Sequence, residues 1–274
     1  MARIDPTARV AAGARLGEDV EIGPYCIVGP DVTLGSGVRL IANVHITGVT
    51  TIGEGTVVYP FASLGAPPQS VHYRGGATRL VVGPRCELRE GVTMNTGTED
   101  GGGETRIGER CLFMVGCHVG HDCHIGNSVT FANNVVLGGH VSVGDHTFLG
   151  GHAAVHQFVR IGEGAMMAGL SGASGDLIPF GYALGQIADL VGLNVVGLRR
   201  RGAERAELHR LRQAYRQLFL ASGVFSERLS SVAREFAGDP LVEKITAFIA
   251  AGGKRPLIHP PATRRSDENG DDAS

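Results

Sequence analysis

The sequence lacks several features that would place it in common functional classes. Its net charge at pH 7 is −2 over 274 residues, so the molecule as a whole has no field suited to nucleic acid. It has no run of about 18 apolar residues, so we expect no transmembrane segment. The N-terminus shows no basic stretch followed by an apolar one, as a signal peptide would. We therefore expect a cytoplasmic protein.

What the sequence does have is a period of six. A large apolar residue recurs at every sixth position over 4–64, 82–94 and 107–167, which makes 25 repeat positions. A fixed hexapeptide period is typical of a parallel β-helix. With three hexapeptides in each triangular coil, residues 18 apart should stack at the spacing between neighbouring strands, about 4.8 Å.

The few cysteines follow the same period. All five lie four residues after a repeat position, in a slot that elsewhere holds small residues such as Ala14, Thr56 and Val129; they are Cys26, Cys86, Cys111, Cys117 and Cys123. A buried thiol packs as a small hydrophobic group. We therefore expect these cysteines to be reduced core residues rather than metal ligands or disulfide partners, which also fits a cytosolic protein.

Two insertions interrupt the period. The first lies near 66–80 and contains polar and aromatic residues, and the second lies near 95–105 and is rich in glycine. Insertions in repeat proteins form loops on one face, and this is often the binding face.

The period ends near Pro179, and the rest of the sequence is expected to be different in structure. We predict an all-β parallel β-helix over 1–190 and a small α-helical C-terminal domain over 191–258. Its predicted helices, bounded by Gly202, Gly223 and Asp239-Pro240, lie near 203–222, 226–237 and 240–251. These helices would cover the exposed end of the solenoid. Residues 259–274 are predicted to be a disordered tail.

The histidines are concentrated in one part of the period. Seven of the eleven fall between 118 and 156. In steps of 18, His121 stacks with Gly139 and Gln157, and Asp122 stacks with His140. One edge is therefore expected to hold six polar residues, which are His118, His121, Asp122, His140, His156 and Gln157. His124, His146 and His152 are expected at other edges.

This edge has the groups needed for general-base acyl transfer. His121 can take a hydroxyl proton, Asp122 can orient the imidazolium, and a backbone N–H exposed by the glycines at 120, 138 and 139 can stabilise an oxyanion. No serine or cysteine nucleophile is evident there, which favours direct attack by the acceptor. Zinc is the competing chemistry. His140, His146 and His152 are six residues apart and so lie on three different faces, and we predict no metal site.

Three segments resemble UDP-N-acetylglucosamine 3-O-acyltransferases, a family of hexapeptide-repeat enzymes with a left-handed parallel β-helix. They read Gly-Cys-His-Val-Gly-His-Asp-Cys over 116–123, Gly-Gly-His-Ala-Ala-Val-His-Gln-Phe over 150–158 and Gly-Leu-Asn-Val-Val-Gly-Leu-Arg-Arg-Arg-Gly over 192–202. The resemblance implies transfer of a (3R)-3-hydroxyacyl group from acyl carrier protein to UDP-N-acetylglucosamine, the first step of lipid A biosynthesis. It also implies a homotrimer with clefts between subunits. No cofactor is implied beyond the phosphopantetheine of the carrier.

The resemblance also assigns roles by position. His121 matches the general base, Asp122 its partner and Gly139 the oxyanion donor. Gly169 matches the floor of the acyl groove, where glycine leaves room for a long chain. The other matched positions line the acyl and sugar-nucleotide cleft, namely His118, His140, His156 and Gln157, or lie near the nucleotide phosphates and the carrier's phosphopantetheine, namely Asn194, Arg200 and Arg201.

The sequence departs from this family mainly in the first insertion. Residues 68–73 read Pro-Gln-Ser-Val-His-Tyr, where the family usually has Pro-Gln-Asp-Leu-Lys-Tyr. Gln69 is retained, whereas Ser70 replaces an aspartate that meets sugar hydroxyls and His72 replaces a lysine. All three are predicted to contact the acceptor. A related transferase that uses another UDP-amino sugar, such as a 3-amino analogue, or an acyl-CoA donor therefore stays open, as does a non-catalytic scaffold.

Overall fold

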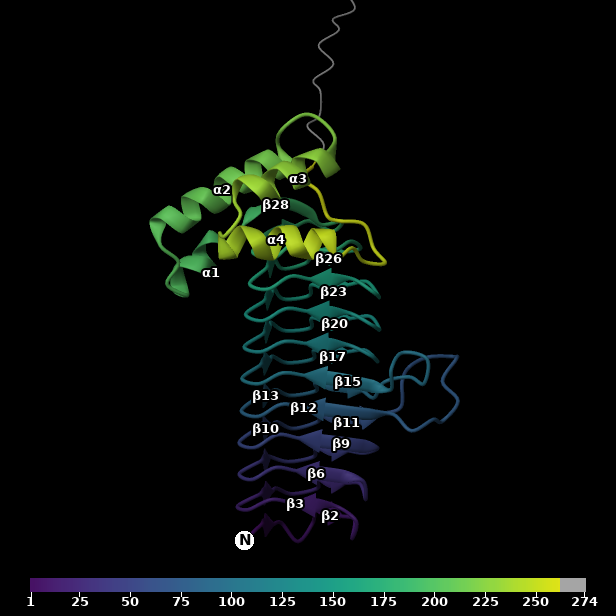
Figure 1. Ribbon diagram of the computed structural model, residues 1–274. Helices are drawn as coiled ribbons and strands as arrows, with labels where there is room; N and C mark the ends of the chain where they lie inside the picture. Colours follow the sequence, from purple (N-terminus) through teal and green to yellow (C-terminus); the bar gives the residue numbers. More distant parts are fainter. Residues whose placement is uncertain (262–274) are drawn as a thin grey trace, which may run out of the picture.

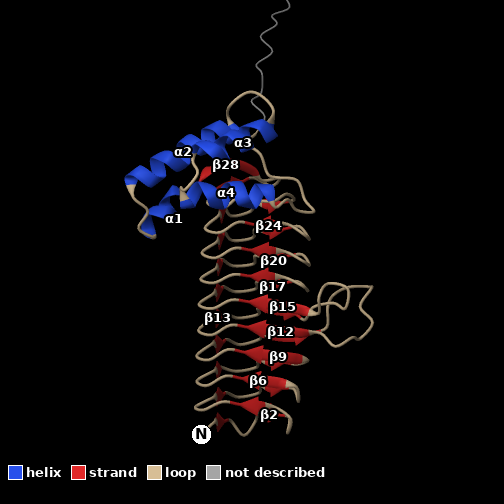
Figure 2. Cartoon of the chain, viewed as in Figure 1, coloured by secondary structure: helices blue, strands red, loops and turns tan. Residues whose placement is uncertain are grey.

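The computed structural model describes residues 1–261, which form a long parallel β-helix with α-helices at one end (Figure 1). Short strands and turns alternate along the whole solenoid (Figure 2). Most of the predicted disordered tail, residues 262–274, lies outside the described residues. Within the described part, no helix is long and apolar enough to cross a membrane.

The solenoid is built from three sheets, whose strands are as follows. The first sheet contains β1 (Arg3–Ile4), β4 (Glu21–Ile22), β7 (Arg39–Leu40), β10 (Val57–Val58), β13 (Glu87–Leu88), β16 (Leu112–Phe113), β19 (Thr130–Phe131), β22 (Phe148–Leu149), β25 (Met166–Met167), β27 (Gly181–Leu184) and β28 (Asp189–Leu193). The second contains β2 (Arg9–Val10), β5 (Ile27–Val28), β8 (His45–Ile46), β11 (Ser63–Ala66), β14 (Thr93–Asn95), β17 (His118–Val119), β20 (Val136–Leu137), β23 (Ala154–Val155) and β26 (Gly172–Ala173). The third contains β3 (Arg15–Leu16), β6 (Val32–Leu34), β9 (Val49–Ile52), β12 (Arg79–Val82), β15 (Glu104–Ile107), β18 (His124–Ile125), β21 (Ser142–Val143) and β24 (Arg160–Ile161).

The register of these strands confirms the stacking of residues 18 apart. Phe113 pairs with Phe131, which pairs with Leu149, and the two phenylalanine rings meet edge to face at 4.8 Å. Every repeat position from Ile22 to Met167 is buried. Each such side chain contributes roughly 1.5–3 kcal/mol of burial free energy, so the six-residue period by itself accounts for the continuous core.

The five cysteines are buried and free, as predicted. Burial raises the pKa of the Cys117 thiol to about 11 and that of Cys123 to about 12. Thiols with such pKa values are protonated at neutral pH and therefore unreactive.

Both insertions leave the solenoid at the same corner, the turn from the second sheet to the third. The first loop, 67–78, connects β11 to β12, and the second loop, 96–103, connects β14 to β15. The strands continue to stack across both loops, because β9 pairs with β12 and β12 pairs with β15. The insertions therefore project from the coil without breaking it, as Figure 1 shows.

Four helices follow the strands within the described residues: α1 (Val195–Arg200), α2 (Arg205–Phe219), α3 (Phe225–Glu235) and α4 (Pro240–Ala250). The last three match the predicted helices to within a few residues. Asp239 caps α4 by accepting hydrogen bonds from Leu241 N and Val242 N, an arrangement typical of a helix start. The sequence analysis missed α1, and it missed the antiparallel pairing of β27 with β28.

The helices cover the C-terminal end of the solenoid (Figure 1). Lys244 of α4 lies 2.6 Å from Glu163, and the guanidinium of Arg160 lies 4.2 Å from the ring centre of Phe248. After α4, residues 253–259, which we call the C-terminal strap, return to the solenoid. Asp176 N donates to Pro256 O at 2.7 Å. The strap therefore lies at the C-terminal end of the same corner from which both loops project.

Candidate active site

The predicted histidine cluster lies at this same corner. We call it the histidine edge and define it by residues 120–122, 138–140 and 156–158, which are the turns after β17, β20 and β23. The second loop borders it on the N-terminal side, and the strap borders it on the C-terminal side. The stacking arithmetic thus placed these turns correctly.

The centre of the edge is a buried histidine–aspartate pair. His121 Nδ1 lies 2.7 Å from Asp122 Oδ2, and the side chains are 18% and 0% exposed. Asp122 also accepts hydrogen bonds from Thr98 N at 2.9 Å and Thr98 Oγ1 at 2.6 Å. A carboxylate only accepts hydrogen bonds, so the His121 proton lies on Nδ1. The Nε2 lone pair is therefore free to act as a base.

Gly139 faces the ring of His121 from the next coil. A Cβ at Gly139 would lie 2.5 Å from His121 Cε1 and 2.7 Å from Nε2, so only glycine leaves the ring in this position. The neighbouring N–H groups are used, since Gly138 N donates to Val155 O and His140 N donates to His121 O. The N–H of Gly139 donates to no other described residue, and it is available to an oxyanion beside the base.

The ring of His140 packs against the ring of His121. The two rings meet edge to face at 5.1 Å, and the His140 ring stacks on Phe158 at 4.5 Å. Burial lowers the pKa of His140, although Asp122 opposes this shift, and the positive charge of Lys254 adds to it. His140 is therefore neutral at pH 7, with one ring nitrogen able to donate a hydrogen bond and the other able to accept one.

The remaining cluster residues flank this centre. His118, on β17, is half-buried and its Nδ1 lies 2.8 Å from Thr93 Oγ1; burial lowers its pKa. Arg255 of the strap contacts His156 Nδ1 at 2.7 Å and donates to Gln157 O at 2.9 Å. The structure thus brings His121, Asp122, Gly139, His140, His156 and Gln157 to this edge, and His118 to the strand that precedes it.

Sequence reasoning missed three residues at this edge: Thr98, Lys254 and Arg255. Thr98 lies in the second interruption of the period, which was the only signal available for it. Lys254 lies with its Nζ 4.3 Å from the ring centre of Phe158. Lys254 and Arg255 follow the last helix, outside any period, and no pattern related them to residues 100 positions earlier.

The edge also contains a group that could in principle ligate a metal. The nearest donor atoms of His121, Asp122 and His140 all lie within 4.8 Å of one another, a set different from the three histidines weighed in the sequence. Both oxygens of Asp122 already accept hydrogen bonds, from Thr98 and His121. A metal would have to break these bonds, so the donor set fits a hydrogen-bonded base better than a metal centre.

The first loop lies next to the edge and contains the predicted acceptor residues. Gln69 and His72 are exposed, and His72 N donates to Ser70 Oγ at 3.3 Å. Glu99 of the second loop accepts from Gly76 N at 2.6 Å. Because Thr98, its neighbour, binds Asp122, the second loop links the first loop to the buried carboxylate.

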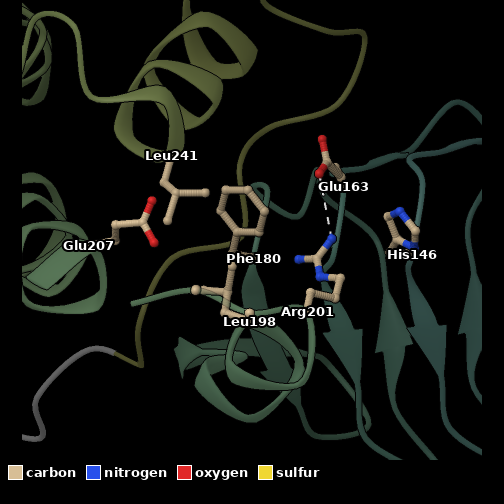
Figure 3. Close-up of a pocket in the computed structure, with 9 residues that line it drawn as sticks. His146, Glu163, Phe180, Leu198, Arg201, Glu207 and Leu241 are labelled. Carbon is tan, nitrogen blue, oxygen red and sulfur yellow. Dashed lines mark ion pairs between the residues drawn. The ribbon is translucent and has the colours of Figure 1, made fainter. Parts of the chain in front are cut away.

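The other predicted site residues lie at other corners of the same chain. Gly169 follows β25, at the turn from the first sheet to the second. Arg201 Nη1 lies 3.5 Å from Glu163 Oε1 at the turn from the third sheet to the first, in a cavity of about 300 Å³ between the solenoid and the helices (Figure 3). Asn194 Nδ2 donates to Gly164 O there, and Arg200 is exposed. One chain does not bring Gly169, Asn194, Arg200 or Arg201 to His121.

Comparison with known proteins identifies the family. A curated acyl-(acyl-carrier-protein)–UDP-N-acetylglucosamine O-acyltransferase from Azorhizobium caulinodans is 60% identical over 260 residues, which cover 95% of this chain and 96% of that protein. This chain belongs to the same family. The enzyme of that name from Rhizobium etli is 49% identical over 259 residues, 94% of this chain and 95% of the relative. The resemblance seen in the sequence is therefore confirmed.

Family models and a solved structure agree with this assignment to the O-acyltransferase family. The model described as "Udp N-acetylglucosamine O-acyltransferase; Domain 2" matches residues 176–258. The model described as "Bacterial transferase hexapeptide (six repeats)" matches 13–48 and 104–139. The solved UDP-N-acetylglucosamine acyltransferase from Campylobacter jejuni has a TM-score of 0.89 and 39% identity, and covers 94% of this chain and 100% of that one.

Proposed function

We propose that this protein transfers a (3R)-3-hydroxyacyl group from acyl carrier protein to the 3-hydroxyl of UDP-N-acetylglucosamine, the first step of lipid A biosynthesis. The observation that carries the proposal is the His121–Asp122 pair, whose Nε2 and the nearby Gly139 N–H make no hydrogen bond to any of residues 1–261. Membership of the O-acyltransferase family supports the donor and the acceptor.

In this mechanism His121 acts as the general base. Nε2 takes the proton of the 3-hydroxyl as that oxygen attacks the thioester carbonyl. The N–H of Gly139 stabilises the oxyanion of the tetrahedral intermediate, and Asp122 stabilises the imidazolium. Collapse breaks the carbon–sulfur bond, and the imidazolium returns its proton to the phosphopantetheine thiolate. The acyl ester and the free thiol then leave.

Direct attack is supported by the state of the nearby nucleophiles. The hydroxyl of Thr98 is engaged, because it donates to Asp122. The thiol of Cys123 is buried and its pKa is raised to about 12. Neither group is prepared to form an acyl-enzyme at this edge, so the acceptor hydroxyl is the nucleophile.

We further propose that the functional unit is a homotrimer of left-handed β-helices, each with a separate helical C-terminal domain. Gly169, Arg200 and Arg201 lie at corners that cannot meet His121 within a triangular coil. A second subunit packed against the histidine edge would supply them, and the cleft would then lie between subunits. The buried, free thiols support a reducing compartment such as the cytoplasm.

The acceptor has one specific alternative, a UDP-sugar with an amino group at the 3-position. Ser70 and His72 lie in the first loop where the family sequence has an aspartate and a lysine, and His72 is exposed. The alternative changes the acceptor but keeps the same base and oxyanion donor. A CoA thioester in place of the carrier is the corresponding alternative for the donor.

The test is an activity panel on the purified protein. Acyl carrier protein and CoA donors are each supplied with UDP-N-acetylglucosamine and with its 3-amino analogue. We expect the carrier and UDP-N-acetylglucosamine to be preferred, and His121→Ala to lower kcat by about 10²–10⁴-fold while the fold is retained, as judged by circular dichroism. His45→Ala, an exposed histidine on β8, is the control. Near-normal turnover by His121→Ala would reject the base, and a CoA or amino-sugar preference would reassign the substrate.

A further inference from the structure

The C-terminal strap makes a specific contact with the histidine edge. Arg255 Nη2 lies 2.7 Å from Nδ1 of His156, a residue 99 positions earlier in the chain. Nε of the same guanidinium donates to the backbone carbonyl of Gln157 at 2.9 Å. One arginine therefore contacts both a side chain of the edge and the backbone beside it.

This contact determines which nitrogen of His156 has the proton. A guanidinium has only donors and stays charged in proteins, so Nδ1 of His156 must be the acceptor. The imidazole is then neutral, with its proton on Nε2. Nδ1 also lies 3.3 Å from Gln157 O. Without Arg255, that carbonyl would be the nearest partner of Nδ1 and would favour the opposite tautomer, in which Nδ1 carries the proton.

Backbone hydrogen bonds hold the strap in place, so that Arg255 can keep His156 in this tautomer. Asp176 N donates to Pro256 O at 2.7 Å, and Ile258 N donates to Asp176 O at 2.9 Å. These backbone bonds directly follow Arg255 in the chain and tie the strap to the end of the solenoid. A side chain supported in this way loses little freedom on forming its hydrogen bonds, which is the condition for setting the geometry of a site.

We propose that Arg255 is a positioning residue that holds His156 as a neutral hydrogen-bond donor through Nε2. His156 borders an apolar cavity of about 290 Å³ lined also by Val155, Ala173 and Ile187. A donor at this border suits an oxygen acceptor of the substrate, such as a carbonyl or a phosphate. The role in catalysis rests on the proposed function, whereas the tautomer does not, because it is a property of the free protein.

Lys254 provides a matched control. It precedes Arg255 on the strap and carries the same charge, but its Nζ lies over the ring of Phe158 and makes no hydrogen bond to His156 among the described residues. Lys254→Ala therefore removes one positive charge at nearly the same place and leaves the contact to His156 intact. Arg255→Ala removes the same charge together with that contact.

The first test is nitrogen NMR of protein labelled with ¹⁵N-histidine, above neutral pH and without substrate. The His156 signals are assigned by their loss in His156→Gln. We expect the Nε2–H tautomer in the wild type and in Lys254→Ala, and a shift toward the Nδ1–H tautomer in Arg255→Ala. An Nδ1–H tautomer in the wild type, or an unchanged tautomer in Arg255→Ala, would overturn the proposal.

The second test is steady-state kinetics with the same variants. Loss of one oriented hydrogen bond predicts a fall in kcat/KM of about tenfold for Arg255→Ala, a smaller fall for Lys254→Ala and a partial recovery for Arg255→Lys. A tautomer change in Arg255→Ala with kcat/KM within about twofold of the wild type would refute the positioning role. If the wild type transfers no acyl group, the proposed function fails, while the NMR result on the tautomer still stands by itself.

Discussion

At the scale of single residues, the proposed role of His121 depends on the hydrogen bonds to the Asp122 carboxylate. Asp122 is buried and accepts from both the backbone and the hydroxyl of Thr98. These bonds compensate the loss of water around the charge. They also direct the carboxylate toward His121, so Thr98 positions the proposed base although it lies in a loop.

Thr98→Val tests this arrangement, because valine keeps the shape and removes the hydroxyl. A hydrogen bond to a charged group is worth about 1.5–3 kcal/mol, so we expect kcat to fall about tenfold or more and the melting temperature to fall as well. Thr98→Ser keeps the hydroxyl and should stay close to the wild type. Equal kcat for Thr98→Val and Thr98→Ser would show that the hydroxyl does not support the base.

The pKa values of His118 and His140 predict how stability depends on pH. Both are lowered in the folded state, chiefly by burial, relative to about 6.5 in the unfolded chain. At pH values between the folded-state and the unfolded-state pKa of each histidine, the unfolded chain binds more protons than the folded chain. These histidines therefore add stability that is present above about pH 6.5 and is lost as the pH falls through their lower folded-state pKa values.

Denaturant unfolding at neutral and mildly acidic pH measures this effect. We expect the free energy of unfolding of the wild type to decrease on acidification. His140→Gln cannot take up the proton, so the decrease should be smaller in that variant. An identical pH dependence in the wild type and in His140→Gln would contradict the assigned role of burial.

At the scale of elements, the second loop connects two parts of the site. Its Thr98 binds Asp122, and its Glu99 accepts hydrogen bonds from Gly76 N and Arg74 N of the first loop. Hydrogen bonds from the backbone of Glu99 itself and of Gly76 lower the pKa of Glu99, so the carboxylate is charged and holds the first loop at neutral pH.

Glu99→Ala should therefore loosen the first loop. We expect faster hydrogen exchange at the amides of Arg74 and Gly76 and a higher KM for the UDP-sugar, with little change in kcat. Asp100→Ala is the matched control, because Asp100 is an exposed neighbour with the same charge and no hydrogen bond to the first loop among the described residues. Equal exchange rates in the two variants would refute the link.

The elements that the sequence predicted are those in which a local pattern repeats. The β-helix and the three longer helices have such a pattern, and both loops were located as interruptions of the six-residue period. The helix α1 is only six residues long, and it begins where Asn194 accepts a hydrogen bond from Gly197 N while donating to Gly164 O of the solenoid. A helix of this length is not stable alone. It exists because of a tertiary contact, and no periodicity indicates such a contact.

At the scale of the whole molecule, the predicted site residues are divided among three corners. His121 lies at the turn from the second sheet to the third, and Gly169 lies at the turn from the first to the second. Arg200 lies on α1, next to Arg201 at the turn from the third sheet to the first. Stacking keeps each of these columns straight along the solenoid. If all three residues contact the same substrate, we therefore expect a second subunit to complete the cleft.

Mixing of inactive variants tests the shared site. We expect a sedimentation mass of three times the 28.6 kDa chain. His121→Ala and Arg200→Ala should each be nearly inactive alone. Trimers refolded from both should regain activity, because some clefts then combine an intact His121 with an intact Arg200. An active monomer, or no recovery in verified mixed trimers, would contradict a site built between subunits.

The sequence by itself determined the β-helix, the inward cysteines and the columns of the histidine edge. It could do so because each of these follows from a strict period, which converts distance along the chain into position in space. It also determined the family through motifs in those columns. Only the tertiary structure decided what surrounds His121. Thr98 and Arg255 reach the edge from an insertion and from the strap after α4, where the period is absent. Their positions follow from packing and hydrogen bonds between segments far apart in the sequence.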